Sequence, residues 1–283
     1  MNAELEKAHD HVRRIVEKSG TSFGLGMKIL PEDGRRAMYG VYAFCREIDD
    51  IADEPGTEQA KRDGLDKWRK EVERLYQGQP EDLTMVALLP AVEAYDLPKQ
   101  EFIELIDGMV MDVDLDFGRA ERLDHSGLHL YCRRVAGAVG MLSIRIFGEP
   151  DATQFALAMG DALQLTNILR DIGEDADEGR IYLPIDMIRA EGITATDPKE
   201  IVRDPRLTAV CDRIAEEADA RFRDAEEQSR RHDRRKLKPA LVMGSIYRGY
   251  LDKLLARGFA DPTATVKMSK AAKATRALRA MMG

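Results

Sequence analysis

Residues 155–175 read FALAMGDALQLTNILRDIGED, and this stretch decides the fold class. Apolar residues fill most of it, as expected for a helix that is buried on nearly all sides. Polar residues nevertheless recur within it at steps of 3, 4 and 4, so that they share one face of the helix. These polar residues are Gln164, Asn167, Asp171 and Asp175.

This polar face carries the amide oxygen of Asn167 and the carboxylates of Asp171 and Asp175. Hard oxygen ligands of this kind suit Mg²⁺, which commonly bridges protein carboxylates to phosphate. Without a cation opposite them, buried carboxylates would repel one another and would be costly to desolvate. The pattern therefore indicates a site for Mg²⁺ and an anionic ligand.

A second helix with a polar stripe is expected over residues 36–54, which read RAMYGVYAFCREIDDIADE. Its polar residues follow one another at steps of 3, 4, 3 and 4, and Asp49 and Asp53 within it are spaced to share a divalent cation. Asp50 lies about 100° further round the helix. The stripe consists of Tyr39, Tyr42, Arg46, Asp49 and Asp53.

Two carboxylates spaced four residues apart on a helix most often mark nothing more than a solvated face. Here there are two such pairs, each on a helix that is apolar elsewhere, and each follows an arginine, Arg46 or Arg170. This combination favours a shared functional site over two unrelated solvated faces.

The rest of the chain is also rich in helix-forming residues and lacks the sustained alternating Val, Ile and Thr segments of a sheet. We therefore expect an all-α fold and one domain over residues 1–283, with a short basic tail at 263–283. Prolines mark the expected breaks between helices. They are Pro31, Pro55, Pro80, Pro98, Pro150, Pro184, Pro198, Pro205, Pro239 and Pro262.

The 283 residues carry a formal net charge of -8, which argues against general affinity for nucleic acid. The three cysteines, Cys45, Cys132 and Cys211, are too few and too far apart for a disulfide framework, so we expect a reducing, cytoplasmic setting. Neither a secretory signal nor a stretch of about 20 apolar residues is apparent. Basic residues recur every three positions along the tail, so on an α-helix they would not stay on one face. This spacing predicts a weak peripheral membrane contact at most.

Two other groups of polar residues receive structural interpretations. The five histidines are dispersed, and the pair His9 and His11 has the wrong spacing for one helix face, so no zinc site is expected. Asp112, Asp114 and Asp116 stand beside the apolar Met109 and Met111 and are interpreted as the solvated end of a helix rather than as a third metal motif.

Four segments resemble the squalene/phytoene synthase family, and the resemblance covers about residues 21–259. They are SFGLGMKILP from Ser22, YGVYAFCREIDDIAD from Tyr39, YCRRVAGAVG from Tyr131 and QLTNILRDIGEDADEGRIYLP from Gln164. The resemblance implies a helical isoprenoid synthase fold around a central apolar cavity.

It also implies roles for individual residues. Tyr131 is expected to aid proton transfer or to steer a carbocation, and Arg46 and Arg170 are expected to assist at the anionic site and to contact substrate. The Mg²⁺ ligands implied are Asp49, Asp53, Asn167, Asp171 and Asp175. Further substrate contacts implied are Ser22, Phe23, Tyr39, Tyr42, Gln164 and Tyr182.

Small residues within YCRRVAGAVG leave space along a helix, either for a cavity or for close packing of another helix. The resemblance favours a cavity that holds prenyl tails. The residues concerned are Ala136, Gly137, Ala138 and Gly140.

The activity that the resemblance implies is the head-to-head joining of two farnesyl diphosphates. The segments SIRIFGEP and REIDDIADEPG are most similar to members of the bacterial hopanoid pathway that make presqualene diphosphate, leaving later steps to other enzymes. For that reaction NADPH is not expected. Phytoene, dehydrosqualene, full squalene and hydroxysqualene synthases remain alternatives, as does a non-catalytic assembly factor, although the intact aspartates speak against the last.

Overall fold

The computed structural model describes residues 2–20, 23–119 and 122–282, and none of these residues lies in a β-strand. The all-α prediction is confirmed. The first part of the chain forms α1 (Asn2–Ser19), α2 (Phe23–Met27), α3 (Glu32–Asp53), α4 (Glu58–Tyr76), α5 (Leu83–Tyr95), α6 (Lys99–Asp116) and α7 (His125–Cys132). The second part forms η1 (Arg133–Gly137), α8 (Ala138–Ile146), α9 (Thr153–Asp177), α10 (Ile185–Ala190), α11 (Pro198–Ile201), α12 (Leu207–Ser229), α13 (Lys238–Arg257) and α14 (Lys270–Met282).

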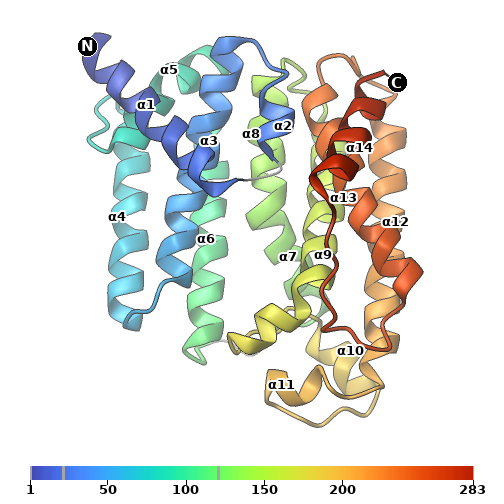
Figure 1. Ribbon diagram of the computed structural model, residues 1–283. Helices are drawn as coiled ribbons and strands as arrows, with labels where there is room; N and C mark the ends of the chain where they lie inside the picture. The colour runs from blue at the N-terminus through green and yellow to red at the C-terminus, as the bar shows by residue number, and fades with distance from the viewer. Residues whose placement is uncertain (1, 21–22, 120–121, 283) are drawn as a thin grey trace.

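The long helices lie side by side in a bundle (Figure 1). Helix α9 packs against α12 and α13 on one side and against η1 and α8 on another, while α3 contacts α5, α6 and α8. The short helices α10 and α11 lie at one end of the bundle, and the two termini lie at the other (Figure 1). The two helices with polar stripes, α3 and α9, thus belong to the interior of one bundle.

One apolar core cluster extends from Val16 on α1 to Ala277 on α14. Its largest members include Phe44 and Phe102, which are fully buried and meet edge to face with their ring centroids 5.2 Å apart. An edge-to-face pair of this kind adds about 1 kcal/mol beyond the burial of the two rings. These contacts fix the relative position of α3 and α6.

All ten predicted breaks lie at helix ends or between helices. Pro31 and Pro98 immediately precede α3 and α6, where the missing amide proton costs nothing. Pro90 behaves differently, since it lies inside α5. No helix in the described part of the chain is long and apolar enough to cross a membrane.

The segment from α7 to α8 is one continuous helix interrupted by the π-helical turn η1. Its glycines allow a close approach to α9: a Cβ added at Gly140 would lie 2.8 Å from the carbonyl oxygen of Ala156. A Cβ added at Gly160 would lie 3.0 Å from backbone atoms of Ala136 and Gly137. Small residues therefore serve helix packing here.

The basic tail folds back as α14 onto α13. Arg276 Nη2 lies 2.7 Å from Asp252 Oδ2, and Lys273 Nζ lies 5.5 Å from the centre of the Tyr250 ring. Two of the basic side chains of the tail therefore bind to groups on α13 of the same molecule.

Candidate active site

Two adjoining cavities occupy the centre of the bundle. One, of about 610 Å³, is lined mainly by polar side chains from α3, α6 and α9, and the other, of about 260 Å³, is almost wholly apolar. Six residues line both cavities, so that the polar space opens directly onto the apolar one. They are Phe23, Tyr42, Cys45, Val135, Gln164 and Asn167.

The last turns of α3 place Arg46, Asp49 and Asp53 on the wall of the polar cavity. Arg46 spans two carboxylates, with Nη1 3.3 Å from Asp49 Oδ2 and Nη2 2.5 Å from Asp50 Oδ1. The Asp49 side chain is 42% accessible, but the walls of the cavity remove part of its hydration. This desolvation and the charge of neighbouring Asp53 raise the pKa of Asp49 to about 6.

On the opposite wall, α9 contributes Asp171 and Asp175. Arg170 donates to both oxygens of Asp171, with Nε 2.7 Å from Oδ1 and Nη2 2.5 Å from Oδ2. Its guanidinium carbon also lies 5.1 Å from the centre of the Tyr250 ring. None of the described arginines donates to Asp175 in this way, and burial together with the charge of Asp171 raises the pKa of Asp175 to about 8.

The donor set fits Mg²⁺. Of the described residues that line the polar cavity, seven carry carboxyl groups and three carry guanidinium groups, so anionic groups are in excess. Asn167 Oδ1 is buried and accepts no hydrogen bond within the described part of the chain. An unpartnered amide oxygen beside carboxylates with raised pKa values is a set of hard ligands that a divalent cation would satisfy.

A buried carboxylate, that of Asp112, forms part of the wall of the polar cavity. Tyr182 Oη donates to Asp112 Oδ1 at 2.8 Å, and Tyr131 Oη donates to Asp112 Oδ2 at 3.3 Å. The two tyrosine rings are stacked with centroids 4.9 Å apart. Burial raises the pKa of Asp112 to about 7, although the Tyr182 hydrogen bond and Arg180 oppose the shift.

Arg180 follows α9 and closes one side of the polar cavity. Its Nη1 lies 2.6 Å from Asp53 Oδ1, and its Nε and Nη2 lie 2.7 Å and 2.8 Å from the two oxygens of Asp116. The side chain is only 10% exposed. A single guanidinium therefore joins α3, α6 and the segment after α9.

Residues 16–272 match the family model described as squalene/phytoene synthase. The chain belongs to the squalene/phytoene synthase family. A relative named presqualene diphosphate synthase, from Rhodopseudomonas palustris, is 46% identical to it over 90% of this chain and 90% of the relative. A 15-cis-phytoene synthase from Synechocystis is 33% identical, over 91% of this chain and 79% of that protein.

Solved structures of the squalene/phytoene synthase family share this fold. A dehydrosqualene synthase in complex with a ligand superimposes with a TM-score of 0.84 and 26% identity, covering 99% of this chain and 97% of that one. A squalene synthase from Alicyclobacillus acidocaldarius gives a TM-score of 0.80 at 26% identity, with coverages of 91% and 96%. The helical isoprenoid synthase fold implied by the sequence is thus confirmed.

Most of the residues that the family resemblance singles out line the two cavities of this family member. Tyr39 is different: it lines neither of them and packs toward the cluster around Ala43 and Ala87. At 100° per residue Tyr39 lies about 80° round the helix from Asp49, whereas Tyr42 lies within about 20° of it. Ser22 lies outside the described residues. Those that line a cavity are Phe23, Tyr42, Arg46, Asp49, Asp53, Tyr131, Gln164, Asn167, Arg170, Asp171, Asp175 and Tyr182.

Some of the small residues of η1 and α8 line a cavity, and others serve close packing between helices. Ala136 and Gly140 line the apolar cavity, whereas Ala138 is fully buried and lines neither cavity. Gly140 also packs closely against α9, as does Gly137, whose added Cβ would lie 3.3 Å from Leu157. The expectation of a cavity wall holds for two of the four positions.

Two residues of this site, Asp112 and Arg180, were not predicted from the sequence. The interpretation of Asp112 as part of a solvated helix end was wrong, because its side chain is 3% exposed and faces the polar cavity. Asp112 and Asp116 are four residues apart on α6, and this spacing was the available signal. For Arg180 no spacing was informative, since its partners lie 64 and 127 residues earlier in the chain.

Proposed function

We propose that this chain catalyses the Mg²⁺-dependent head-to-head condensation of two farnesyl diphosphates to presqualene diphosphate. The observation that carries the proposal is the direct opening of an acidic cavity, lined by both aspartate pairs, onto an apolar one. A diphosphate needs the first environment and a prenyl chain needs the second. The name and the 46% identity of the Rhodopseudomonas palustris relative support presqualene diphosphate as the product.

Mg²⁺ bound by Asp49, Asp53, Asn167, Asp171 and Asp175 would stabilise the charge of the departing diphosphate. Arg46 and Arg170 would bind its oxygens from α3 and α9. Without ligand, both arginines pair with carboxylates at the cavity. If Mg²⁺ bound to carboxylates there, the two guanidinium groups would become available to the diphosphate oxygens.

The reaction joins carbon atoms that must be kept from water. The C1–O bond of one farnesyl diphosphate breaks, and the alkene of the second attacks the resulting allylic cation at C1. Loss of a proton then closes the cyclopropane ring, while the second diphosphate is retained. Phe23 and Tyr42 lie where the two cavities meet, and their ring faces would stabilise positive charge there.

Tyr131 is our candidate for receiving the proton. Its hydroxyl group already donates to Asp112 in the wall of the polar cavity. Burial raises the pKa of the Tyr131 hydroxyl well above its usual value and the pKa of Asp112 to about 7. A substrate proton would therefore reach the Tyr131 oxygen as the hydroxyl proton passes to Asp112, without a free tyrosinate. Tyr182 would hold Asp112 in place through its own hydrogen bond.

The test is to incubate the purified chain with farnesyl diphosphate and Mg²⁺, with and without NADPH, and to identify products by chromatography with mass detection. We expect a C30 product that retains one diphosphate, formed at the same rate with or without NADPH. Squalene formed only with NADPH would identify a full squalene synthase. A phosphate-free C30 polyene without NADPH would identify a dehydrosqualene synthase, and a C40 product from geranylgeranyl diphosphate alone a phytoene synthase. Absence of any product would refute the proposal, and presqualene diphosphate offered as substrate would then test for hydroxysqualene formation.

We further propose that the product leaves through a weak peripheral membrane contact of α14. This helix exposes Leu278 and Met282, whose surfaces are 56% and 73% accessible, beside Arg279. Flotation with vesicles containing anionic lipid should recover a minor fraction of the protein. Replacing Leu278 by Ser should abolish that fraction, and equal recovery of the two proteins would contradict the contact.

A further inference from the structure

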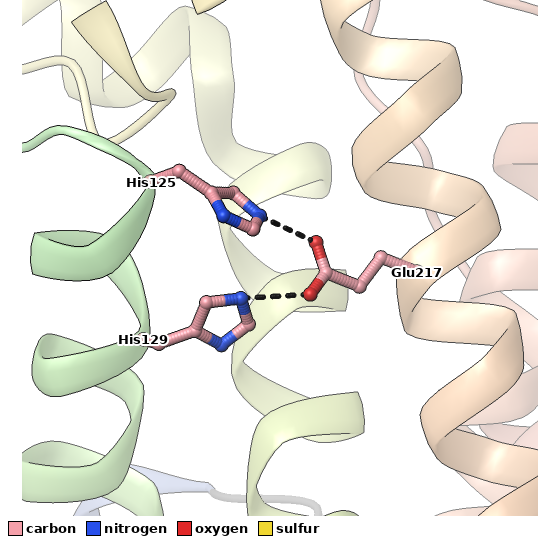
Figure 2. A group of neighbouring side chains, drawn as sticks. All are labelled: His125, His129 and Glu217. Atoms are coloured by element: carbon pink, nitrogen blue, oxygen red, sulfur yellow. Dashed lines mark hydrogen bonds and ion pairs between the residues drawn. The ribbon is translucent and has the colours of Figure 1, made fainter. Parts of the chain in front are cut away.

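Two histidines and a glutamate meet outside both cavities (Figure 2). His125 and His129 lie one turn apart on α7, and Glu217 faces them from α12. The Nε2 atom of His125 lies 3.1 Å from Glu217 Oε2, and that of His129 lies 2.7 Å from Glu217 Oε1. The two imidazole rings are perpendicular, with centroids 4.7 Å apart.

The expectation that the histidines are dispersed is wrong for this pair. The spacing of four residues places His125 and His129 on one face of α7. Their third partner, Glu217, follows 92 residues after His125, and only the packing of α12 brings it opposite them.

The three side chains match the ligand set and the dimensions of a zinc site. One candidate ligand atom from each lies within 4.8 Å of the other two. Ligand atoms bound tetrahedrally at about 2.0–2.1 Å from zinc lie about 3.3 Å apart, so small side-chain rotations would close the set. Because the three side chains are 45%, 26% and 23% exposed, they have room to rotate, and water can reach a fourth position.

The charges around the group also permit a cation. Glu217 is the only carboxylate that pairs with these histidines among the described ion pairs. One turn further along α12, Arg221 lies 3.4 Å from Asp161 of α9, so that its charge is already balanced. The N-terminus of α7 is held in place because Asp124 caps it and Asp186 accepts a hydrogen bond from the His125 backbone amide at 3.1 Å.

We propose that His125, His129 and Glu217 bind one divalent cation of the zinc class, which would cross-link α7 to α12. Two imidazole nitrogens and one carboxylate favour Zn²⁺ over Mg²⁺, so this site differs in chemistry from the acidic cavity. Its position has a structural consequence, because Tyr131 lies two residues beyond His129 on the same helix. A metal here would stiffen the helix that presents Tyr131.

The test uses the untagged full chain, freed of metal by dialysis against a chelator. Zn²⁺ is titrated calorimetrically in the presence of excess Mg²⁺, which competes with Zn²⁺ for the acidic cavity. We expect one tight Zn²⁺ site in the parent and a rise in its melting temperature with Zn²⁺. His129→Gln and Glu217→Gln should each weaken Zn²⁺ binding by at least about tenfold and remove that thermal shift. Co²⁺ in place of Zn²⁺ should give the intense visible absorption of a four-coordinate nitrogen-ligated ion in the parent but not in His129→Gln or Glu217→Gln.

Three matched variants make the outcome decisive. His11→Gln removes a histidine that is also paired with a glutamate, Glu47 at 3.2 Å, and should bind Zn²⁺ like the parent. Asp171→Asn alters the acidic cavity and should also keep the Zn²⁺ site. Glu217→His restores a third ligand and should recover Zn²⁺ binding. Such recovery would show that Glu217→Gln weakens binding through loss of a ligand and not through loss of folding.

Equal Zn²⁺ affinity in the parent and His129→Gln would overturn the proposal. So would Zn²⁺ binding that is lost in Asp171→Asn but kept in His129→Gln, because the ion would then occupy the acidic cavity. The catalytic assay with farnesyl diphosphate is independent of this result, so failure of one proposal leaves the other standing.

Discussion

Arg180 Nη1 lies 2.6 Å from Asp53 Oδ1, although the two residues are 127 positions apart in the chain. The same guanidinium is bound by both oxygens of Asp116. A fixed positive group therefore holds one acidic wall of the polar cavity together, and it pairs with a carboxylate that is also a proposed Mg²⁺ ligand. Binding of Mg²⁺ at Asp53 would have to share that carboxylate with Arg180.

Replacing Arg180 by Gln should lower both stability and turnover. The change leaves Asp53 and Asp116 without their guanidinium partner, and we expect the free energy of unfolding to fall by roughly 2–4 kcal/mol. Arg180→Lys should recover only part of this loss, because an ammonium group cannot bind Asp116 through two parallel hydrogen bonds. Denaturant unfolding measures the effect, with the exposed Arg189→Gln as control. Equal stability of Arg180→Gln and the parent would contradict the assigned role.

Asp49→Asn and Asp171→Asn should each lower turnover of farnesyl diphosphate by orders of magnitude while the helical circular dichroism spectrum stays unchanged. Each removes one carboxylate from the proposed Mg²⁺ ligands. In Asp49→Asn, loss of charge repulsion should leave the metal-free protein as stable as the parent or more so, because the pKa of Asp49 is raised. Asp171→Asn also weakens the paired hydrogen bonds from Arg170, so no such gain is expected there. Asp66→Asn, at an exposed position on α4, serves as control. Activity within a few-fold of the parent in both cavity variants would refute the metal assignment.

The metal-free protein should lose stability as the pH rises. The folded-state pKa of Asp175 is raised from 3.8 to about 8, so the folded state favours the protonated carboxyl group. The resulting stabilisation is complete below about pH 4 and is lost as the pH rises through about 8. Melting temperatures measured across this range in a chelating buffer should fall less steeply in Asp175→Asn than in the parent. Parallel curves for the two proteins would show that Asp175 is not the group responsible.

Mg²⁺ and a diphosphate ligand should stabilise the protein together. A non-hydrolysable farnesyl diphosphate analogue should raise the melting temperature more with Mg²⁺ than with EDTA, because ligand and cation balance the acidic cavity only jointly. The variant Asp171→Asn should lose most of this difference. Equal shifts in the two buffers for the parent would mean that metal and diphosphate do not share a site.

Gly160→Ala should destabilise the protein by about 1–3 kcal/mol. The new methyl group would lie 3.0 Å from backbone atoms of Ala136 and Gly137, and backbone cannot move aside as a flexible side chain can. Gly24→Ala is the matched control, since an added Cβ there meets nothing within 4 Å. Thermal unfolding of both variants checks the difference, and equal midpoints would show that α9 and η1 can separate without cost.

The spacing of polar residues along α3 and α9 was sufficient to predict most of the polar residues that these two helices contribute to the polar cavity. A helix has a regular period, so residues three or four positions apart in the chain lie on one face whatever the rest of the molecule does. Asp49, Asp53, Asp171 and Asp175 were found in this way. Tyr39 shows the limit of the rule, because the ten residues from Tyr39 to Asp49 fall short of three full turns and leave the two side chains about 80° apart.

By itself the sequence determined the all-α class, the helix boundaries at prolines and the two acidic faces, all of which depend on local stereochemistry and helical period. Only the tertiary structure decided that Arg180 pairs with Asp53, that Asp112 is buried between Tyr131 and Tyr182, and that Glu217 faces His125 and His129. These relationships join residues from different helices. They depend on how whole helices pack against one another, and no periodicity within a single segment encodes that packing.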